Sequence, residues 1–187
     1  MEEKAKGRVL LLFSGGIDST ACIQWYLDLG YSINPLFIKF GQLSEHLELK
    51  SARQICAFYQ LDLIELKVQS RNSFSSGEIL GRNLMFLATA LFNIGENEVI
   101  SLGIHSGTGY YDCSEAFVNS FNRIVSESTD GTARLEAPFV NWNKKQIWEY
   151  CQVKKIPIEL TYSCEKGGQT MCGKCATCRD LIMLYGK

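Results

Sequence analysis

Near its N-terminus the chain reads RVLLLFSGGIDST over residues 8–20. Residues 9–13 form an uninterrupted apolar run, which is typical of a central parallel strand covered on both faces. Residues 14–16 end that run, because their two glycines permit a tight turn and a close approach of the backbone to a ligand. Apolar residues then recur at helical spacing beyond Asp18, so the stretch predicts a strand, a loop and a helix.

This loop has the features of a phosphate site. Free N–H groups at a helix N-terminus, hydroxyl groups and the helix dipole together favour an anion. The pattern lacks the lysine of a Walker A loop, and it is not Gly-x-Gly-x-x-Gly. A loop whose glycines serve only the turn is the alternative interpretation.

Length and composition favour one domain with a small appendage. The 187 residues are 46% hydrophobic, which is enough for one substantial core. With 19 basic and 20 acidic residues the net charge is −1, which predicts a small-molecule substrate and neither nucleic acid nor membrane as partner. No apolar run approaches the roughly 18 residues of a membrane span, and none resembles a signal sequence, so we expect a cytoplasmic protein.

The rest of the chain predicts an α/β fold. Further strands are expected at residues 32–40, 62–66 and 98–103, and helices at 43–59, 84–92, 114–126 and 144–154. Residues 69–79 read as a long loop, and 135–139 as a short segment. The alternation indicates a Rossmann-like, doubly wound parallel sheet, whose ligands bind where the strands end. The loops after Phe13, Phe40 and Gly103 should therefore face one crevice.

Four cysteines near the C-terminus follow a C-x7-C-x2-C-x2-C spacing: Cys164, Cys172, Cys175 and Cys178. Two-residue spacers let thiolates converge on one ion, and four sulfurs suit a structural, tetrahedral zinc ion. An iron–sulfur cluster and two disulfides remain as alternatives. We expect residues 1–155 to form the nucleotide-binding unit, with the cysteine segment 156–187 packed against it. Of the scattered cysteines, Cys22, Cys56 and Cys151 fit helix faces as core residues, and for Cys113 a structural role is also preferred.

Residues 14–19 match all six positions of the Ser-Gly-Gly-x-Asp-Ser loop of the PP-loop ATP pyrophosphatases, which split ATP between its α- and β-phosphates. Together with the cysteine spacing, the chain resembles the 7-cyano-7-deazaguanine synthase family of queuosine precursor synthesis nearly from end to end. Shorter matching motifs are Phe40-Gly41-Gln42, Gly81-Arg82-Asn83-Leu84, Gly109-Tyr110-Tyr111-Asp112-Cys113, Asn143-Lys144 and Thr161-Tyr162-Ser163-Cys164.

The resemblance implies an ATP-dependent carbon–nitrogen ligase that forms homodimers. It would adenylate 7-carboxy-7-deazaguanine, form the amide with ammonia, and convert the amide to the nitrile. The implied catalytic residues are Asp18, Ser19, Arg82 and Lys144, with Asp18 as a ligand of Mg²⁺. Residues expected to bind ATP are Phe13, Ser14, Gly15, Gly16, Ile17, Asp18, Ser19, Thr20, Phe40, Gly41, Gln42, Arg82, Asn83, Gly103 and Lys144. Residues expected to bind the substrate are His46, Tyr110 and Asp112. For Arg82, Lys144 and His46, a solvated surface position is the alternative.

The chain departs from the family pattern where the base would bind. Residues 43–45 separate the Gly-Gln motif from His46, residues 104–108 carry no acid and form a shorter loop, and Ser114 stands where the family has arginine. ATP activation is therefore better supported than the identity of the acceptor. Two alternatives follow. One is a divergent paralogue in anti-phage defence that stops at the amide or transfers a deazaguanine to a protein or another amine. The other is a non-catalytic nucleotide-binding partner.

Overall fold

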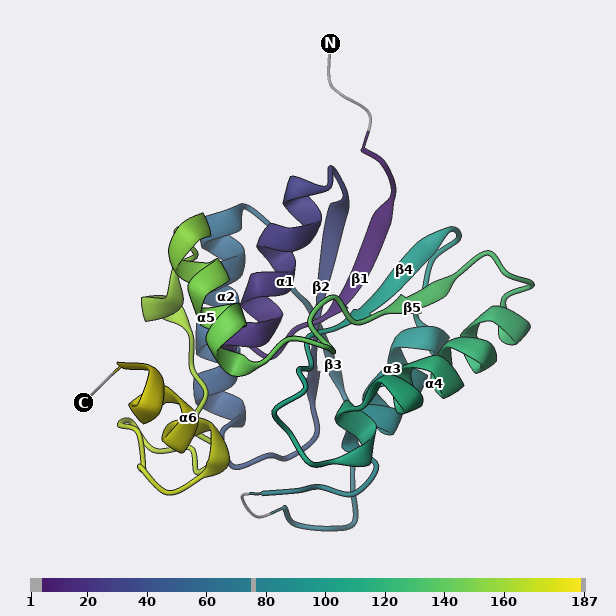
Figure 1. The fold of residues 1–187 in the computed structure, drawn as a ribbon. Helices are drawn as coiled ribbons and strands as arrows, with labels where there is room; N and C mark the ends of the chain where they lie inside the picture. The colour runs from purple at the N-terminus through teal and green to yellow at the C-terminus, as the bar shows by residue number, and fades with distance from the viewer. Residues whose placement is uncertain (1–4, 75–76, 186–187) are drawn as a thin grey trace.

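A computed structural model of the chain describes residues 5–74 and 77–185. Within these residues, five strands form one sheet in the order β3-β2-β1-β4-β5, and every neighbouring pair is parallel. The strands are β1 (Arg8–Leu12), β2 (Ser32–Lys39), β3 (Ile64–Lys67), β4 (Glu98–Leu102) and β5 (Arg134–Glu136). The predicted Rossmann-like parallel sheet is confirmed (Figure 1).

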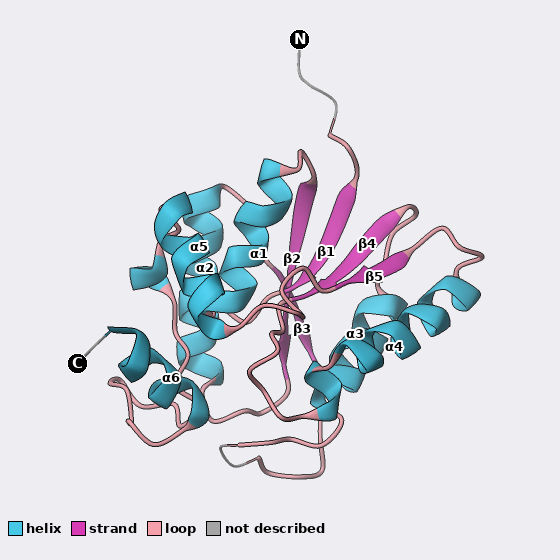
Figure 2. Ribbon diagram, viewed as in Figure 1, coloured by secondary structure: helices cyan, strands magenta, loops and turns pink. Residues whose placement is uncertain are grey.

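Helices cover both faces of the sheet (Figure 2). They are α1 (Ile17–Asp28), α2 (Glu45–Tyr59), α3 (Arg82–Phe92), α4 (Glu115–Ser128), α5 (Lys144–Lys154) and α6 (Ala176–Tyr185), with short 3-10 turns at Tyr111–Cys113 and Ile158–Leu160. Helices α1, α2 and α5 lie on one face, and α3 and α4 lie on the other. This arrangement is the doubly wound one, because the crossovers through α1 and α2 pass on one side of the sheet and those through α3 and α4 pass on the other.

The central strand β1 contributes to two cores. Val9 and Leu11 pack with the α1, α2 and α5 side, while Leu10 and Leu12 pack with the α3 and α4 side. All four are at most 6% exposed. Alternate residues of a strand point to opposite faces, so a strand covered on both sides must be apolar throughout. This burial explains the unbroken apolar run that precedes the loop.

Several element boundaries differ from the sequence-based expectation. Strand β3 begins at Ile64 rather than at residue 62, and the segment expected at 135–139 forms the short strand β5. Helix α6 was not expected at all. It begins directly after Cys175 and contains Cys178, so the cysteine spacing masked its helical pattern. No helix in the described part of the chain is long and apolar enough to span a membrane.

The cysteine segment is joined to the loop after β1 by backbone contacts. The N–H of Tyr162 donates to the carbonyl of Gly15 at 3.0 Å. The Ser51 hydroxyl of α2 lies 2.8 Å from the same carbonyl and 2.6 Å from that of Leu160. Gly167 packs so closely on the carbonyl of Leu43 that a side chain could not fit there. These contacts attach residues 160–167 directly to the edge of the sheet where the strands end.

Candidate functional site

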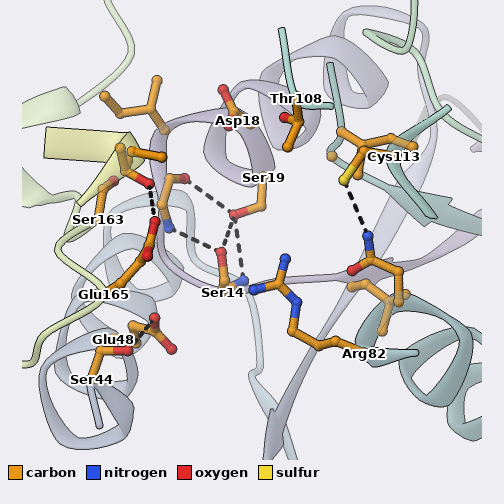
Figure 3. A pocket seen from close by; sticks show the side chains of 18 of the residues that line it. Ser14, Asp18, Ser19, Ser44, Glu48, Arg82, Thr108, Cys113, Ser163 and Glu165 are labelled. Carbon is orange, nitrogen blue, oxygen red and sulfur yellow. Dashed lines mark hydrogen bonds between the residues drawn. The ribbon is translucent and has the colours of Figure 1, made fainter. Parts of the chain in front are cut away.

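A cavity of about 600 Å³ opens at this edge of the sheet. The loops after β1, β2 and β4 line it, as the sequence predicted from Phe13, Phe40 and Gly103. A further wall comes from the cysteine segment and helix α6, including Ser163, Glu165 and other polar residues (Figure 3). Residues within 12–19 and within 162–183 therefore line the same cavity.

The glycines of the loop are required by its packing. Gly15 has φ +75°, and a Cβ there would lie 2.8 Å from the backbone nitrogen of Ala52 and 2.9 Å from the carbonyl of Glu48. A Cβ on Gly103 would lie 3.0 Å from the backbone nitrogen of Ser19. Only glycine permits such close approach of backbones. The loop after β1 therefore packs directly on the backbone of α2, and the end of β4 packs directly on the first turn of α1.

The loop presents hydrogen-bonding groups to the cavity. The hydroxyls of Ser14 and Ser19 lie 3.2 Å apart, and the N–H of Gly16 donates to the Ser14 hydroxyl at 3.3 Å (Figure 3). Because the N–H of Thr20 makes the first bond of α1, to the carbonyl of Gly16, the N–H groups of residues 17–19 precede the helical ladder. Free N–H groups beside two hydroxyls form a site suited to phosphate oxygens.

Asp18 and Lys144 form an ion pair at this loop. The Lys144 Nζ lies 2.6 and 2.7 Å from the two carboxylate oxygens of Asp18, with side chains 13% and 21% exposed. Lys144 is the first residue of α5, whose start is fixed by a capping box between Asn143 and Gln146. The expected phosphate ligand and the expected Mg²⁺ ligand therefore neutralise each other in this structure.

His105 also contacts this pair, and the sequence analysis did not select it. Its Nε2 lies 3.9 Å from an Asp18 carboxylate oxygen, and its Nδ1 accepts a hydrogen bond from the N–H of Gly107 at 3.0 Å. Burial lowers the pKa of His105 below its ordinary value of 6.5, although the charge of Asp18 opposes the shift. Its place two residues after Gly103, in a loop at the carboxyl edge, was the available signal.

Arg82, the first residue of α3, lines the same cavity. Figure 3 shows its guanidinium directed toward Ser14. Its Nε is buried and has no hydrogen-bond partner among the residues that the structure describes. A buried, unpaired donor of this kind is costly unless a ligand satisfies it, and the forked guanidinium matches phosphate geometry.

Glu48 is a second residue that sequence reasoning missed. Its carboxylate accepts hydrogen bonds from the Ser44 hydroxyl at 2.7 Å and from the amide of Gln42 at 3.0 Å. Burial raises the pKa of Glu48, while these two bonds lower it. Ser44 lies in the 43–45 segment that departs from the family pattern, so the departure adds a partner to a cavity carboxylate. Through its hydrogen bond with the Gln42 amide, Glu48 also orients this expected ligand-binding residue.

Asn83 and Asp112 are hydrogen-bonded to each other at the edge of the cavity. The backbone N–H of Asn83 donates to an Asp112 carboxylate oxygen at 3.2 Å, and its amide donates to the Asp112 carbonyl at 2.9 Å. The Asn83 amide also reaches the Cys113 sulfur at 3.5 Å. Burial raises the pKa of Cys113 to about 11, so the thiol stays protonated near neutral pH.

The structure brings most of the expected residues to the cavity but not all of them. Those that line it are Phe13, Ser14, Gly16, Ile17, Asp18, Ser19, Phe40, Gln42, Arg82, Asn83, Gly103, Tyr110 and Lys144. Those outside its lining are Gly15, Thr20, Gly41, His46 and Asp112. The Thr20 hydroxyl is fully buried and donates to the carbonyl of Gly16 at 2.8 Å. Thr20 therefore stabilises the conformation of the loop and does not face the cavity.

His46 does not reach the cavity. It is exposed on helix α2, where it lines a separate shallow depression with Lys50 and Arg53. Residues 43–45 intervene between the Gly-Gln motif and His46, and α2 already begins at Glu45. The first turn of that helix directs the imidazole outward, which corresponds to the surface alternative.

The four clustered cysteines are arranged for a metal ion. All four ligand sulfurs lie within 4.8 Å of one another, and none of the eight cysteines is joined in a disulfide in this structure. The Cys172 sulfur accepts N–H groups from Cys175 and Lys174, each at 3.4 Å. Of these, the Cys175 bond contributes most to lowering the pKa of Cys172 to about 6. Because metals bind thiolates, this geometry fits a metal-binding site.

Glu165 links the cysteine segment to two neighbours at the cavity. One carboxylate oxygen accepts the N–H of Gly77 at 3.1 Å, and the other accepts the Thr177 hydroxyl at 3.1 Å. The segment after β3 and helix α6 are thereby held to the same side chain. A metal ion in the cysteine cluster would stabilise this wall of the cavity.

A parallel α/β sheet with a Ser-Gly-Gly-x-Asp-Ser loop at its carboxyl edge defines a protein of the PP-loop fold. The family model described as "Queuosine biosynthesis protein QueC" matches residues 8–80 and 69–181. The chain therefore belongs to the QueC family.

Curated relatives agree with this assignment, and a solved structure shares the fold. A 7-cyano-7-deazaguanine synthase of Acetivibrio thermocellus is 26% identical over 201 residues, covering 91% of this chain and 89% of that protein. One from Halobacterium salinarum is 28% identical over 207 residues, covering 95% and 90%. NMN synthetase from Francisella tularensis has the same fold, with a TM-score of 0.52 and 16% identity over 98% of this chain and 78% of that one.

Proposed function

We propose that this protein converts 7-carboxy-7-deazaguanine to 7-cyano-7-deazaguanine, using ATP and ammonia and releasing AMP and pyrophosphate. The observation that carries the proposal is the Asp18–Lys144 pair beside the free N–H groups at the start of α1. The names of the relatives support the choice of product, and the substrate is the one that the family resemblance implies. The balanced charge favours small-molecule substrates and no nucleic-acid partner, we expect the protein in the cytoplasm, and the family resemblance implies a homodimer.

The first step adenylates the substrate. A carboxylate oxygen attacks the α-phosphorus of ATP, and the bond to the pyrophosphate oxygen breaks. Negative charge grows on the leaving pyrophosphate, where the hydroxyls of Ser14 and Ser19 and the N–H groups of residues 17–19 can donate to it. Donors fixed in advance at the point where charge develops are a large source of catalysis.

The Asp18–Lys144 pair separates in this proposal. Asp18 would hold Mg²⁺, which neutralises charge on the phosphates when bound. Lys144 would then donate to phosphate oxygens instead of to Asp18, so each charge exchanges one partner for another. Before ATP binds, the pair keeps the Lys144 side chain, which is 13% exposed, from being buried without a counter-charge.

Arg82 is suited to the nucleotide phosphate that remains on the substrate. Its guanidinium points toward Ser14, and its Nε is free to donate. Ammonia then attacks the acyl carbon, and AMP leaves with the former carboxylate oxygen. The amide oxygen is adenylated by a second ATP in the same way, and loss of AMP and two protons gives the nitrile.

The heterocycle would lie at the aromatic side of the cavity. Phe40 stacks edge-on with Phe86 at 5.3 Å between ring centroids, and Tyr110 lines the same cavity. Flat aromatic surfaces bury a planar base at low entropic cost. The cysteine cluster would hold a structural Zn²⁺ through Cys164, Cys172, Cys175 and Cys178, which stabilises the opposite wall.

Pyrophosphate release in the presence of 7-carboxy-7-deazaguanine, ATP and ammonium tests the proposal. The expected product is the nitrile. AMP formation only with a protein or another amine as acceptor would favour the paralogue of anti-phage defence systems, as would a product that stops at the amide. Tight nucleotide binding without turnover for any acceptor would favour a non-catalytic partner.

A further inference from the structure

His105 occupies a place in the fold that no motif of the sequence identifies. It follows β4 by three residues, and Gly103 brings that strand end against the first turn of α1. As a result, the imidazole lies beside Asp18, with its side chain 10% exposed. It lines the cavity together with Lys144.

The loop that carries His105 is held to the segment before Lys144. The Ser106 N–H and hydroxyl donate to the carbonyl of Trp142 at 2.9 and 2.8 Å. Trp142 precedes Lys144 by only two residues, and the capping box at Asn143 fixes the start of α5. His105 and Lys144 are therefore positioned relative to each other before any ligand binds.

The hydrogen bonds of the ring determine what the imidazole can do. Because Nδ1 accepts the N–H of Gly107, this nitrogen carries no proton, and the neutral ring has its proton on Nε2. The 3.9 Å separation from Asp18 is too long for a hydrogen bond, and no described residue accepts one from Nε2. His105 thus offers a neutral donor to the cavity and has no free nitrogen to act as a base.

We propose that the Nε2–H of His105 donates a hydrogen bond to the pyrophosphate group of ATP, beside Lys144. This assignment rests on the proposed function, because that function places pyrophosphate at the start of α1. A neutral donor adds a hydrogen bond without adding a second cation next to Lys144. The charged groups that face the ring are Asp18 of α1, Lys144 of α5 and Asp180 of α6.

Two amide variants separate this role from a structural one. In His105→Gln the amide nitrogen can take the position of Nε2, whereas in His105→Asn it reaches only the position of Nδ1. In His105→Asn the amide oxygen, turned to the position of Nδ1, can accept the N–H of Gly107, in His105→Gln that N–H is left to water, and neither variant carries a charge. Titration calorimetry with inorganic pyrophosphate and Mg²⁺ compares them with the wild-type protein, at temperatures below the melting midpoint of each.

Loss of one hydrogen bond to a charged group weakens binding by about tenfold or more, so His105→Asn should bind pyrophosphate that much less tightly. His105→Gln should stay within about threefold of the wild-type protein, and the affinity for AMP should be unchanged in both. Equal pyrophosphate affinity of His105→Asn and wild type would overturn the inference alone. A wild-type protein that binds neither pyrophosphate nor ATP would overturn it together with the proposed function.

Discussion

The Nζ of Lys144 lies 2.6 and 2.7 Å from the two carboxylate oxygens of Asp18, although 126 positions separate the two residues in the chain. Asp18→Asn should lower AMP formation by about a thousandfold, because the proposed carboxylate ligand of Mg²⁺ at the phosphates is lost. It should also lower the free energy of unfolding by about 2 kcal/mol, since Lys144 is left without its partner. The double variant Asp18→Asn/Lys144→Met should recover most of that stability and no activity.

Lys145 provides the matched control. It neighbours Lys144 in α5, but its side chain is 77% exposed and, within residues 5–74 and 77–185, pairs only with Glu149. Lys145→Met should change AMP formation by less than about threefold, because exposed pairs contribute little. Equal losses in Lys144→Met and Lys145→Met would contradict the assignment of the loop.

Crowding at Gly15 gives a second prediction. Gly15 and Gly30 have nearly the same backbone angle, φ +75° and +79°, but a Cβ on Gly30 would meet nothing within 4 Å. Gly30→Ala should cost about 1 kcal/mol from the left-handed conformation alone. Gly15→Ala should cost about 3 kcal/mol, because overpacking against α2 is added. Urea unfolding measures both, and equal costs would show that the loop is not packed as described.

Metal analysis tests the cysteine cluster. The protein should contain about one zinc ion per chain, and Cys175→Ser should lose it and unfold more easily, because structural zinc is coupled to folding. ATP should also bind more weakly, since Tyr162 and Gly167 connect the cysteine segment to the loops of the cavity. Cys56→Ala, in the core of α2, should retain the metal. A brown, iron-containing protein would reverse the choice of metal.

Acid should destabilise the protein through His105. Because burial lowers its pKa below the ordinary 6.5, the unfolded chain binds more protons than the folded protein just below that pH. Stability therefore rises with pH up to about 6.5 and falls on acidification below it. His105→Gln removes this dependence, so the melting midpoints of wild type and variant should diverge as the pH drops from 7 toward 5. Parallel curves would mean that His105 is not buried as the structure has it.

Local signals predicted much of the fold and of the phosphate loop. The apolar run of β1 and the glycines after it depend on nearby residues, and parallel strands end at one edge by necessity. The pairing of Asp18 with Lys144 arises from the packing of α1 against α5, so their sequence positions alone carry no sign of it. For the same reason, Lys144 was expected at phosphate and not at Asp18.

Other features depended on geometry that sequence motifs do not encode. Glu48 faces the cavity because α2 begins at Glu45, and the same helix start turns His46 outward. His105 has its proton on Nε2 because its Nδ1 accepts the N–H of Gly107. Any residue at position 107 except proline could make this backbone contact, so the sequence does not show it. Helix α6 was hidden because the metal-ligand spacing and the helical pattern share the same residues.

The central claim is that ATP adenylates a carboxylate held in this cavity. Incubation with ATP, ammonium and 7-carboxy-7-deazaguanine labelled with oxygen-18 in its carboxylate tests it directly, with mass spectrometry of the released AMP. Adenylation transfers a carboxylate oxygen to phosphorus, so the AMP should be heavier by one labelled oxygen and the nitrile should contain none. Unlabelled AMP would contradict the account, because ATP would then have been cleaved by water or by another acceptor.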